Sequence, residues 1–188
     1  LKRKGLGMDV AVRRMALLLV AVLVCGITVF AADEARAHED AITGVVSGQQ
    51  IQKVGFRAMI QKHAIMLNLA GSARNNPNGT VSISLQGDRD RIDKALEAIR
   101  AGSKRSSHDN TISMANAPLD PNLKTFTVFG WTSTSRNITN PYDLIFHLRP
   151  TDDELSKKQA EAAWNAIAES TLRGDDLKKF MNRLGGED

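Results

Sequence analysis

The feature that most constrains the fold of this chain is a β-branched stretch that runs into a glycine-bearing turn and then a helix. Residues 42–46 are rich in valine and isoleucine, which is typical of a strand. From Gly55 to Asn68, apolar residues recur at three- and four-residue spacing, which predicts an amphipathic helix. This order places backbone N–H groups, the positive end of a helix dipole and Arg57 around one small volume. Because a guanidinium meets two oxygens at once, the volume suits an oxyanion such as phosphate.

The same kind of patterning continues through the middle of the chain. The predicted elements are a strand over 69–75, a hairpin turn at 76–79, a strand over 81–85, a helix from Gly87-Asp88 to about Gly102, and strands over 111–115 and 126–131. The order is β-α-β-β-α-β. It predicts an α+β fold, a ferredoxin-like α/β sandwich in which an antiparallel sheet carries two helices on one face.

Residues beyond Trp131 predict a C-terminal extension made of a strand and helices. A polar connector over 132–141 precedes a strand over 142–148, and residues 151–154 have the form of a capping box that starts a helix. A further short helix is predicted after Gly174. The extension either covers the domain or docks a partner, and the sequence leaves both open.

The N-terminal residues have the layout of an export signal. Arg13 and Arg14 precede an uncharged apolar run from Met15 to Ala32, and residues 35–37 offer a small-x-small cleavage site. A retained single-span anchor is the alternative, because the run is near the shortest length that spans a bilayer. We therefore expect an exported protein, periplasmic or secreted, or else a membrane-anchored one. The expected division is 1–37 (signal peptide or anchor), 40–132 (domain) and 133–188 (extension).

Charge and cysteine content exclude several classes of function for the domain. The net charge is +4, but six of the 25 basic and three of the 21 acidic residues lie in 1–37, which leaves 19 and 18 in the rest. That balance does not support a nucleic-acid partner. Cys25 is the only cysteine and lies in the apolar run, so the domain has no disulfide and no cysteine-based metal site. The four histidines are dispersed, without metal-ligand spacing.

Two stretches of the chain resemble the two signatures of the acylphosphatase family. The positions that match the first are Gly48, Ile51, Gln52, Val54, Phe56 and Arg57, and those that match the second are Gly71, Ala73, Arg74, Asn75, Gly79, Val81 and Gly87. The resemblance covers roughly residues 40–132. The chain departs from the family at three points: one extra residue between Gly48 and Ile51, Lys53 in place of glycine, and Ser72 in place of an aromatic residue.

The resemblance implies a ferredoxin-like hydrolase that cleaves small-molecule acyl phosphates into carboxylate and phosphate. It implies that Arg57 binds the phosphate and Asn75 positions the attacking water, with no metal and no cofactor. It also implies a phosphate-binding loop made of Gln50, Ile51, Gln52, Lys53, Val54, Gly55 and Phe56. No nucleic acid is expected as a partner, and a membrane is expected only through an uncleaved N-terminal segment.

Lys53 supports an alternative function. A side chain makes a positive φ costly, and the family has glycine at this position. The alternative is a catalytically weak or inactive ferredoxin-like module that binds an anion or a protein at the cell envelope. Taken alone, Arg57 is an ordinary surface arginine and Asn75 an ordinary turn residue. Their joint spacing is what favours the enzyme.

Overall fold

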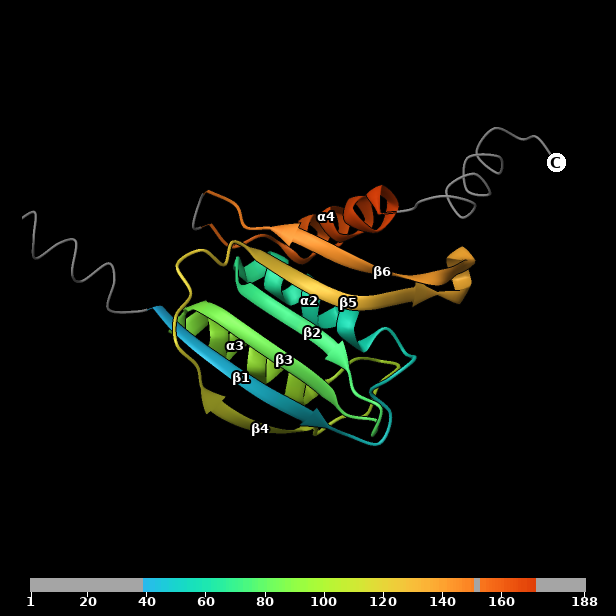
Figure 1. The fold of residues 1–188 in the computed structure, drawn as a ribbon, viewed down its shortest axis with the longest axis horizontal. Helices are drawn as coiled ribbons and strands as arrows, with labels where there is room; N and C mark the ends of the chain where they lie inside the picture. The colour runs from blue at the N-terminus through green and yellow to red at the C-terminus, as the bar shows by residue number, and fades with distance from the viewer. Residues whose placement is uncertain (1–38, 151–152, 172–188) are drawn as a thin grey trace, which may run out of the picture. The chain divides into compact units, whose positions relative to one another are not determined.

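A mixed β-sheet with helices on one face makes up the part of the chain that the structure describes, residues 39–150 and 153–171 of a computed structural model (Figure 1). Its elements are β1 (Glu39–Ser47), α2 (Phe56–Leu67), β2 (Ala70–Asn75), β3 (Val81–Asp88), α3 (Arg89–Ala101), β4 (Thr111–Asn116), β5 (Thr125–Ser133), the 3₁₀ turn η1 (Thr134–Arg136), β6 (Ile138–His147) and α4 (Lys157–Ser170). The predicted ferredoxin-like order of strands and helices is confirmed.

The strands follow the order β4-β1-β3-β2-β5-β6 across the sheet. Neighbouring strands run antiparallel except for β2 and β5, which pair in parallel. The sequence pattern did not predict this parallel pair. The direction of β5 is set by the segment that connects it to β4. Residues 117–124 carry the chain from β4 across the end of the sheet to β5, so β5 enters in the direction of β2. The Gln86 side chain holds this crossing segment by two 2.8 Å hydrogen bonds to the backbone of Asp120.

The alternation along β3 shows how the sequence assigns the two faces of the sheet. Val81, Ile83 and Leu85 are buried against the helices, whereas Ser82 and Ser84 lie on the opposite face. Burial of one face and hydration of the other fixes the register of the strand. Helices α2 and α3 cover the apolar face, as Figure 1 shows, and their buried residues complete the core.

Asp88 caps α3 as predicted, since its side chain accepts a hydrogen bond from the Arg91 backbone N–H. Gly102 follows the last residue of the same helix. The hairpin turn at 76–79 is also confirmed, with Gly79 at φ +86° between β2 and β3.

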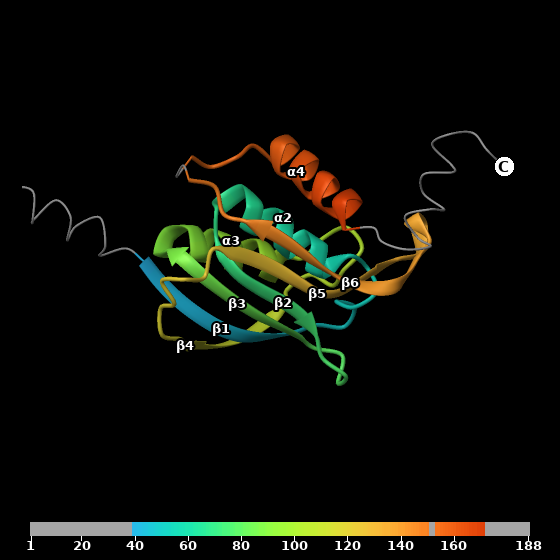
Figure 2. The ribbon, with the colours of Figure 1, turned by 45° about the horizontal axis from the view of Figure 1, so that its top comes forward.

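The C-terminal extension joins the same sheet and core. Strand β6 pairs with β5 at the edge of the sheet and starts at Ile138, earlier than the predicted strand, because Pro141 is tolerated in an edge strand. Helix α4 packs against α2 (Figure 2). Trp164 of α4 meets Trp131 of β5 edge-on, with 5.8 Å between ring centres.

The predicted start of this last helix is wrong. Helix α4 begins at Lys157, where Ser156 and Gln159 form a capping box. Residues 151–154 have the same sequence form, and local pattern alone does not decide between two such boxes. The predicted helix after Gly174 and the N-terminal run lie outside the described residues. Among residues 39–150 and 153–171, no helix is long and apolar enough to cross a membrane.

Candidate active site

The loop between β1 and α2 contains two residues in the left-handed conformation. Lys53 has φ +63° and Gly55 has φ +80°. Glycine adopts this region freely, whereas a residue with a side chain does so at a cost of about 1–2 kcal/mol. Lys53 therefore takes a positive φ despite its side chain, which is exposed.

The backbone N–H groups of this loop have no acceptor in the part of the chain that the structure describes. Within the described residues, the amides from Ile51 to Arg57 donate no hydrogen bond to a backbone or side-chain oxygen. Helix α2 also begins without a capping side chain, and its first turn has no acidic residue. The N-terminus of a helix carries a partial positive charge that capping groups or anions normally balance. The loop and the helix start thus offer unused donors and a positive field.

Side-chain contacts hold this loop against its neighbours. Gln52 Nε2 donates to the carbonyls of Asn76 and Thr80, each at 2.8 Å, which joins the loop to the β2–β3 turn. The carbonyl of Gln50 accepts a 3.0 Å hydrogen bond from the Ser107 backbone. The loop is therefore positioned relative to the end of β2, where Asn75 lies.

Arg57 lies in the first turn of α2 and reaches across to β5. Its Nη1 donates to the carbonyls of Phe129 and Gly130, the second at 3.3 Å. Burial lowers the pKa of Arg57, because removal from water disfavours the charged form. No carboxylate among the described residues forms an ion pair with it. A half-buried guanidinium held only by carbonyl groups is suited to pairing with an anion.

Asn75 is the last residue of β2, and its side chain lies next to a hollow. In the described part of the chain, this amide makes no hydrogen bond, and its Oδ1 is buried. Buried amide groups are almost always hydrogen-bonded, so an unpaired one next to a cavity is available to a ligand or a water. Rotation of the amide by 180° exchanges its oxygen and nitrogen without breaking any bond to the protein.

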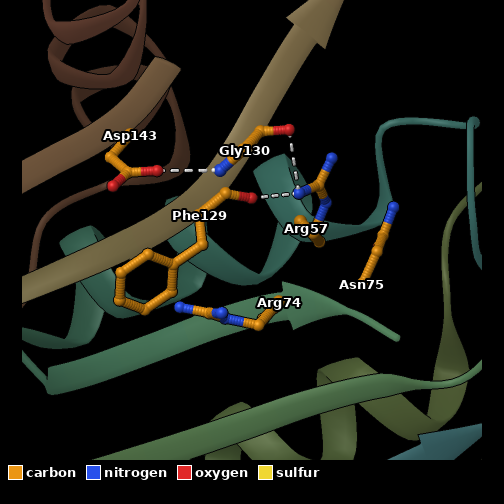
Figure 3. Close-up of a pocket in the computed structure, with 6 residues that line it drawn as sticks. All are labelled: Arg57, Arg74, Asn75, Phe129, Gly130 and Asp143. Carbon is orange, nitrogen blue, oxygen red and sulfur yellow. Dashed lines mark hydrogen bonds between the residues drawn. The ribbon is translucent and has the colours of Figure 1, made fainter. Parts of the chain in front are cut away.

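Arg57 and Asn75 line the same hollow, of about 380 Å³, although one comes from a helix and the other from a strand (Figure 3). None of the predicted loop residues 50–56, Lys53 included, is among the lining residues. The sequence analysis did not predict the other four residues of the site. They are Arg74, Phe129, Gly130 and Asp143. The guanidinium of Arg74 stacks over the Phe129 ring, with 4.2 Å between Cζ and the ring centre. Gly130 could have been recognised from the sequence as the position of a β-bulge, because a glycine inside a predicted strand often marks one.

The predicted loop residues differ in what their side chains do. Ile51 and Phe56 are buried in the core, so only their backbone amides can reach a ligand. Gln50 and Lys53 are exposed, and Val54 is partly buried.

Ser72, which departs from the family pattern, does not line the hollow. Its Oγ lies 2.9 Å from Ser84 Oγ, a side-chain contact between neighbouring strands. This departure therefore leaves the lining of the hollow unchanged.

Metal-ligating side chains do not gather anywhere in residues 39–150 and 153–171. No three His, Cys, Asp or Glu residues there lie in an arrangement that could hold a metal ion.

Comparison with known proteins gives one consistent result. The acylphosphatase family model matches residues 42–128. The chain is 44% identical over 62 residues to an acylphosphatase of Methanocella arvoryzae, an alignment that covers 33% of this chain and 69% of that protein. It is 34% identical over 88 residues to an acylphosphatase of Lactobacillus johnsonii, covering 47% of this chain and 88% of that protein. Among solved structures, an acylphosphatase from Coxiella burnetii aligns with 27% identity and a TM-score of 0.44, over 50% of this chain and 96% of that one.

Proposed function

Because this chain belongs to the acylphosphatase family, we propose that Arg57 and Asn75 carry out its hydrolysis of carboxyl-phosphate anhydrides. The chain is an acylphosphatase-like hydrolase, and its substrates are small-molecule acyl phosphates. The roles of individual residues are our proposal. The observation that carries it is the hollow lined by both a carbonyl-held guanidinium and an amide without a partner among the described residues. The loop whose N–H groups have no acceptor in that part of the chain leads directly into Arg57.

Arg57 binds the phosphoryl group together with the loop amides. The two carbonyl groups of β5 hold Nη1, which fixes the plane of the guanidinium before substrate arrives. The remaining N–H groups of Arg57 then meet phosphoryl oxygens, and the amides of residues 51–57 add neutral donors. These donors stabilise the negative charge on the phosphoryl oxygens in the transition state. Because the donors are already in place, the site does not need to rearrange during the reaction.

Asn75 holds the attacking water. Its amide oxygen accepts a hydrogen bond from the water, which directs a lone pair of the water toward phosphorus, opposite the carboxylate leaving group. Both protons of the water leave with the phosphate. Water attacks, the phosphorus–oxygen bond to the carboxyl group breaks, and carboxylate and phosphate leave. An acyl phosphate is already an activated anhydride, so alignment of one water supplies much of the required catalysis.

Lys53 is compatible with this function. The loop reaches a left-handed conformation at residue 53 with lysine in place of glycine, and the lysine side chain is exposed and does not line the hollow. The alternative of an inactive binding module was based on this residue. The geometry of the loop favours the enzyme.

The cellular setting belongs to the proposal as well. The basic and then apolar order of residues 1–37 supports export to the periplasm or the medium, with a single-span anchor as the alternative. The near-neutral charge of the remaining chain supports the absence of a nucleic-acid partner. Contact with a membrane would then come only through the N-terminal segment.

Hydrolysis of acetyl phosphate by the purified protein tests the reaction and its independence from metals. We expect turnover at an unchanged rate in excess EDTA, because protein donors alone stabilise the phosphoryl charge. Arg57→Lys keeps the charge but loses the two-oxygen geometry, and we expect a loss of roughly 10²-fold in kcat/KM. A wild-type rate that disappears with EDTA, or a lysine variant as active as wild type, would overturn the proposal.

A further inference from the structure

Strand β6 lies beyond the residues that match the family model, yet it brings Asp143 to the hollow. Val128 pairs with Leu144 and Trp131 pairs with Tyr142, with a register shift between the two pairs. Phe129 and Gly130 of β5 therefore lie opposite the single residue Asp143. Two residues opposite one define a β-bulge, a feature that often redirects groups next to active sites.

Asp143 and Arg57 bind opposite ends of one peptide group in this bulge. The Phe129 carbonyl and the Gly130 N–H belong to the same planar unit and point in opposite directions. Arg57 Nη1 donates to the carbonyl, and Asp143 Oδ1 accepts from the N–H at 2.9 Å (Figure 3). Gly130 has φ +60°, a conformation that glycine enters and leaves easily, so the peptide needs a contact to fix its direction.

We propose that Asp143 is a positioning residue for the active site: it orients the Phe129–Gly130 peptide, which in turn holds Arg57 for phosphate. The inference rests on the proposed function. It makes the C-terminal extension part of the catalytic apparatus, because β6 supplies a group that residues 42–128 do not contain.

Charge alone gives no reason for a carboxylate at this place. A negative group beside an anion site opposes anion binding. Asp143 is also exposed, so it contributes no apolar burial to the core. The hydrogen bond to Gly130 is the contact that accounts for its position in the hollow.

The test compares three variants of the full-length chain. Asp143→Val removes the acceptor while keeping a residue suited to a strand. Asp143→Asn keeps an acceptor oxygen and removes the charge. Ile145→Ala is the control, because Ile145 is an exposed residue two positions along the same strand. For each we measure acetyl phosphate kinetics, calorimetric binding of inorganic phosphate and the thermal midpoint, with Arg57→Lys as the reference for a damaged site.

We expect Asp143→Val to weaken phosphate binding and to raise KM roughly tenfold, as loss of a charge-assisted hydrogen bond behind Arg57 would do. Its kcat should change less than its KM, because Arg57 holds the phosphoryl group in both the ground state and the transition state. Asp143→Asn should bind phosphate at least as tightly as wild type, and Ile145→Ala should match wild type.

Three results would overturn the inference. One is wild-type phosphate binding and kinetics in Asp143→Val. Another is tighter phosphate binding in both Asp143 variants, which would make Asp143 a repulsive charge only. The third is an Asp143→Asn variant as impaired as Asp143→Val. If the wild-type protein hydrolyses no acetyl phosphate, the proposed function fails, and the phosphate titration still decides the role of Asp143.

Discussion

Arg57 combines two properties that rarely occur together in a surface arginine. Its Nη1 is held by backbone carbonyls of β5, and its charge has no carboxylate partner among the described residues. The first property orders the side chain before a ligand arrives, and the second leaves its charge available. A preorganised donor of this kind loses little conformational entropy on binding, which is how a small site obtains useful affinity.

Replacing Lys53 by glycine should stabilise the protein. The substitution removes the cost of the left-handed conformation, about 1–2 kcal/mol. It also adds about 0.5–1 kcal/mol in favour of the unfolded chain, because glycine is more flexible there. We therefore expect the free energy of unfolding, measured by urea titration, to rise by up to about 1.5 kcal/mol. Gly55→Ala is the matched reverse change, because a Cβ there has no atom within 4 Å and only its φ of +80° is unfavourable. A Lys53→Gly protein less stable than wild type would show that the loop carries no strain at this residue.

Arg57 and Asn75 were predicted from sequence as residues of the site, whereas Asp143 could not be. Arg57 and Asn75 stand at fixed spacing within two recognisable signatures, so their convergence followed from the resemblance. Asp143 reaches the hollow through a register shift between β5 and β6. Such a shift depends on strand pairing over the whole edge of the sheet, and no local pattern around residue 143 encodes it.

The loop between β1 and α2 depends on a neighbouring hairpin for its position. Gln52 joins the two through hydrogen bonds to the carbonyls of Asn76 and Thr80. Asn75 immediately precedes this hairpin turn. The Gln52 side chain therefore sets the distance between the N–H groups of the loop and the Asn75 amide.

Substituting Gln52 by alanine should reduce activity more than stability. Without the two bonds the loop and the end of β2 move independently, and a displacement of the phosphate relative to the water by about 1 Å costs up to 10²-fold in rate. We expect kcat/KM for acetyl phosphate to fall about tenfold or more. Gln49→Ala is the control, because Gln49 is exposed, lies outside the predicted loop and has a side chain that makes no hydrogen bond within the described residues. Equal activities for the two alanine variants would show that the contact has no role in the site.

The strands and helices of the core could be predicted from sequence because the apolar pattern of each repeats several times. The alternation at Val81, Ile83 and Leu85 and the spacing in α2 each repeat several times. The extension was less predictable. Two capping boxes of equal form occur close together, and the choice of Ser156 over residues 151–154 places α4 where Trp164 packs on Trp131.

The helix of the extension packs beside α2 and also contacts β6 of the sheet. Helix α4 covers part of α2, and His63 of α2 lies near Lys157 at the start of α4. Burial, together with the charge of Lys157, lowers the pKa of His63 below its ordinary value of 6.5.

Acid should therefore weaken the folded state through His63. The unfolded chain takes up a proton as the pH falls through about 6.5. The folded chain takes it up only at lower pH, so stability falls across the interval between the two pKa values. Thermal midpoints from pH 7.5 to pH 5 should decline more steeply in wild type than in His63→Gln, which keeps a polar side chain and does not titrate. Parallel profiles would show that His63 has equal proton affinity in both states.

The central claim is that Arg57 and Asn75 act on one bound phosphoryl group in different roles. The direct measurement is acetyl phosphate hydrolysis, with inhibition by inorganic phosphate, for wild type, Arg57→Ala and Asn75→Ala. We predict that both variants lose at least about 10²-fold in kcat/KM. Phosphate should still inhibit the residual activity of Asn75→Ala, and Arg57→Ala should lose phosphate inhibition. Hydrolysis by either variant at the wild-type rate would contradict the claim.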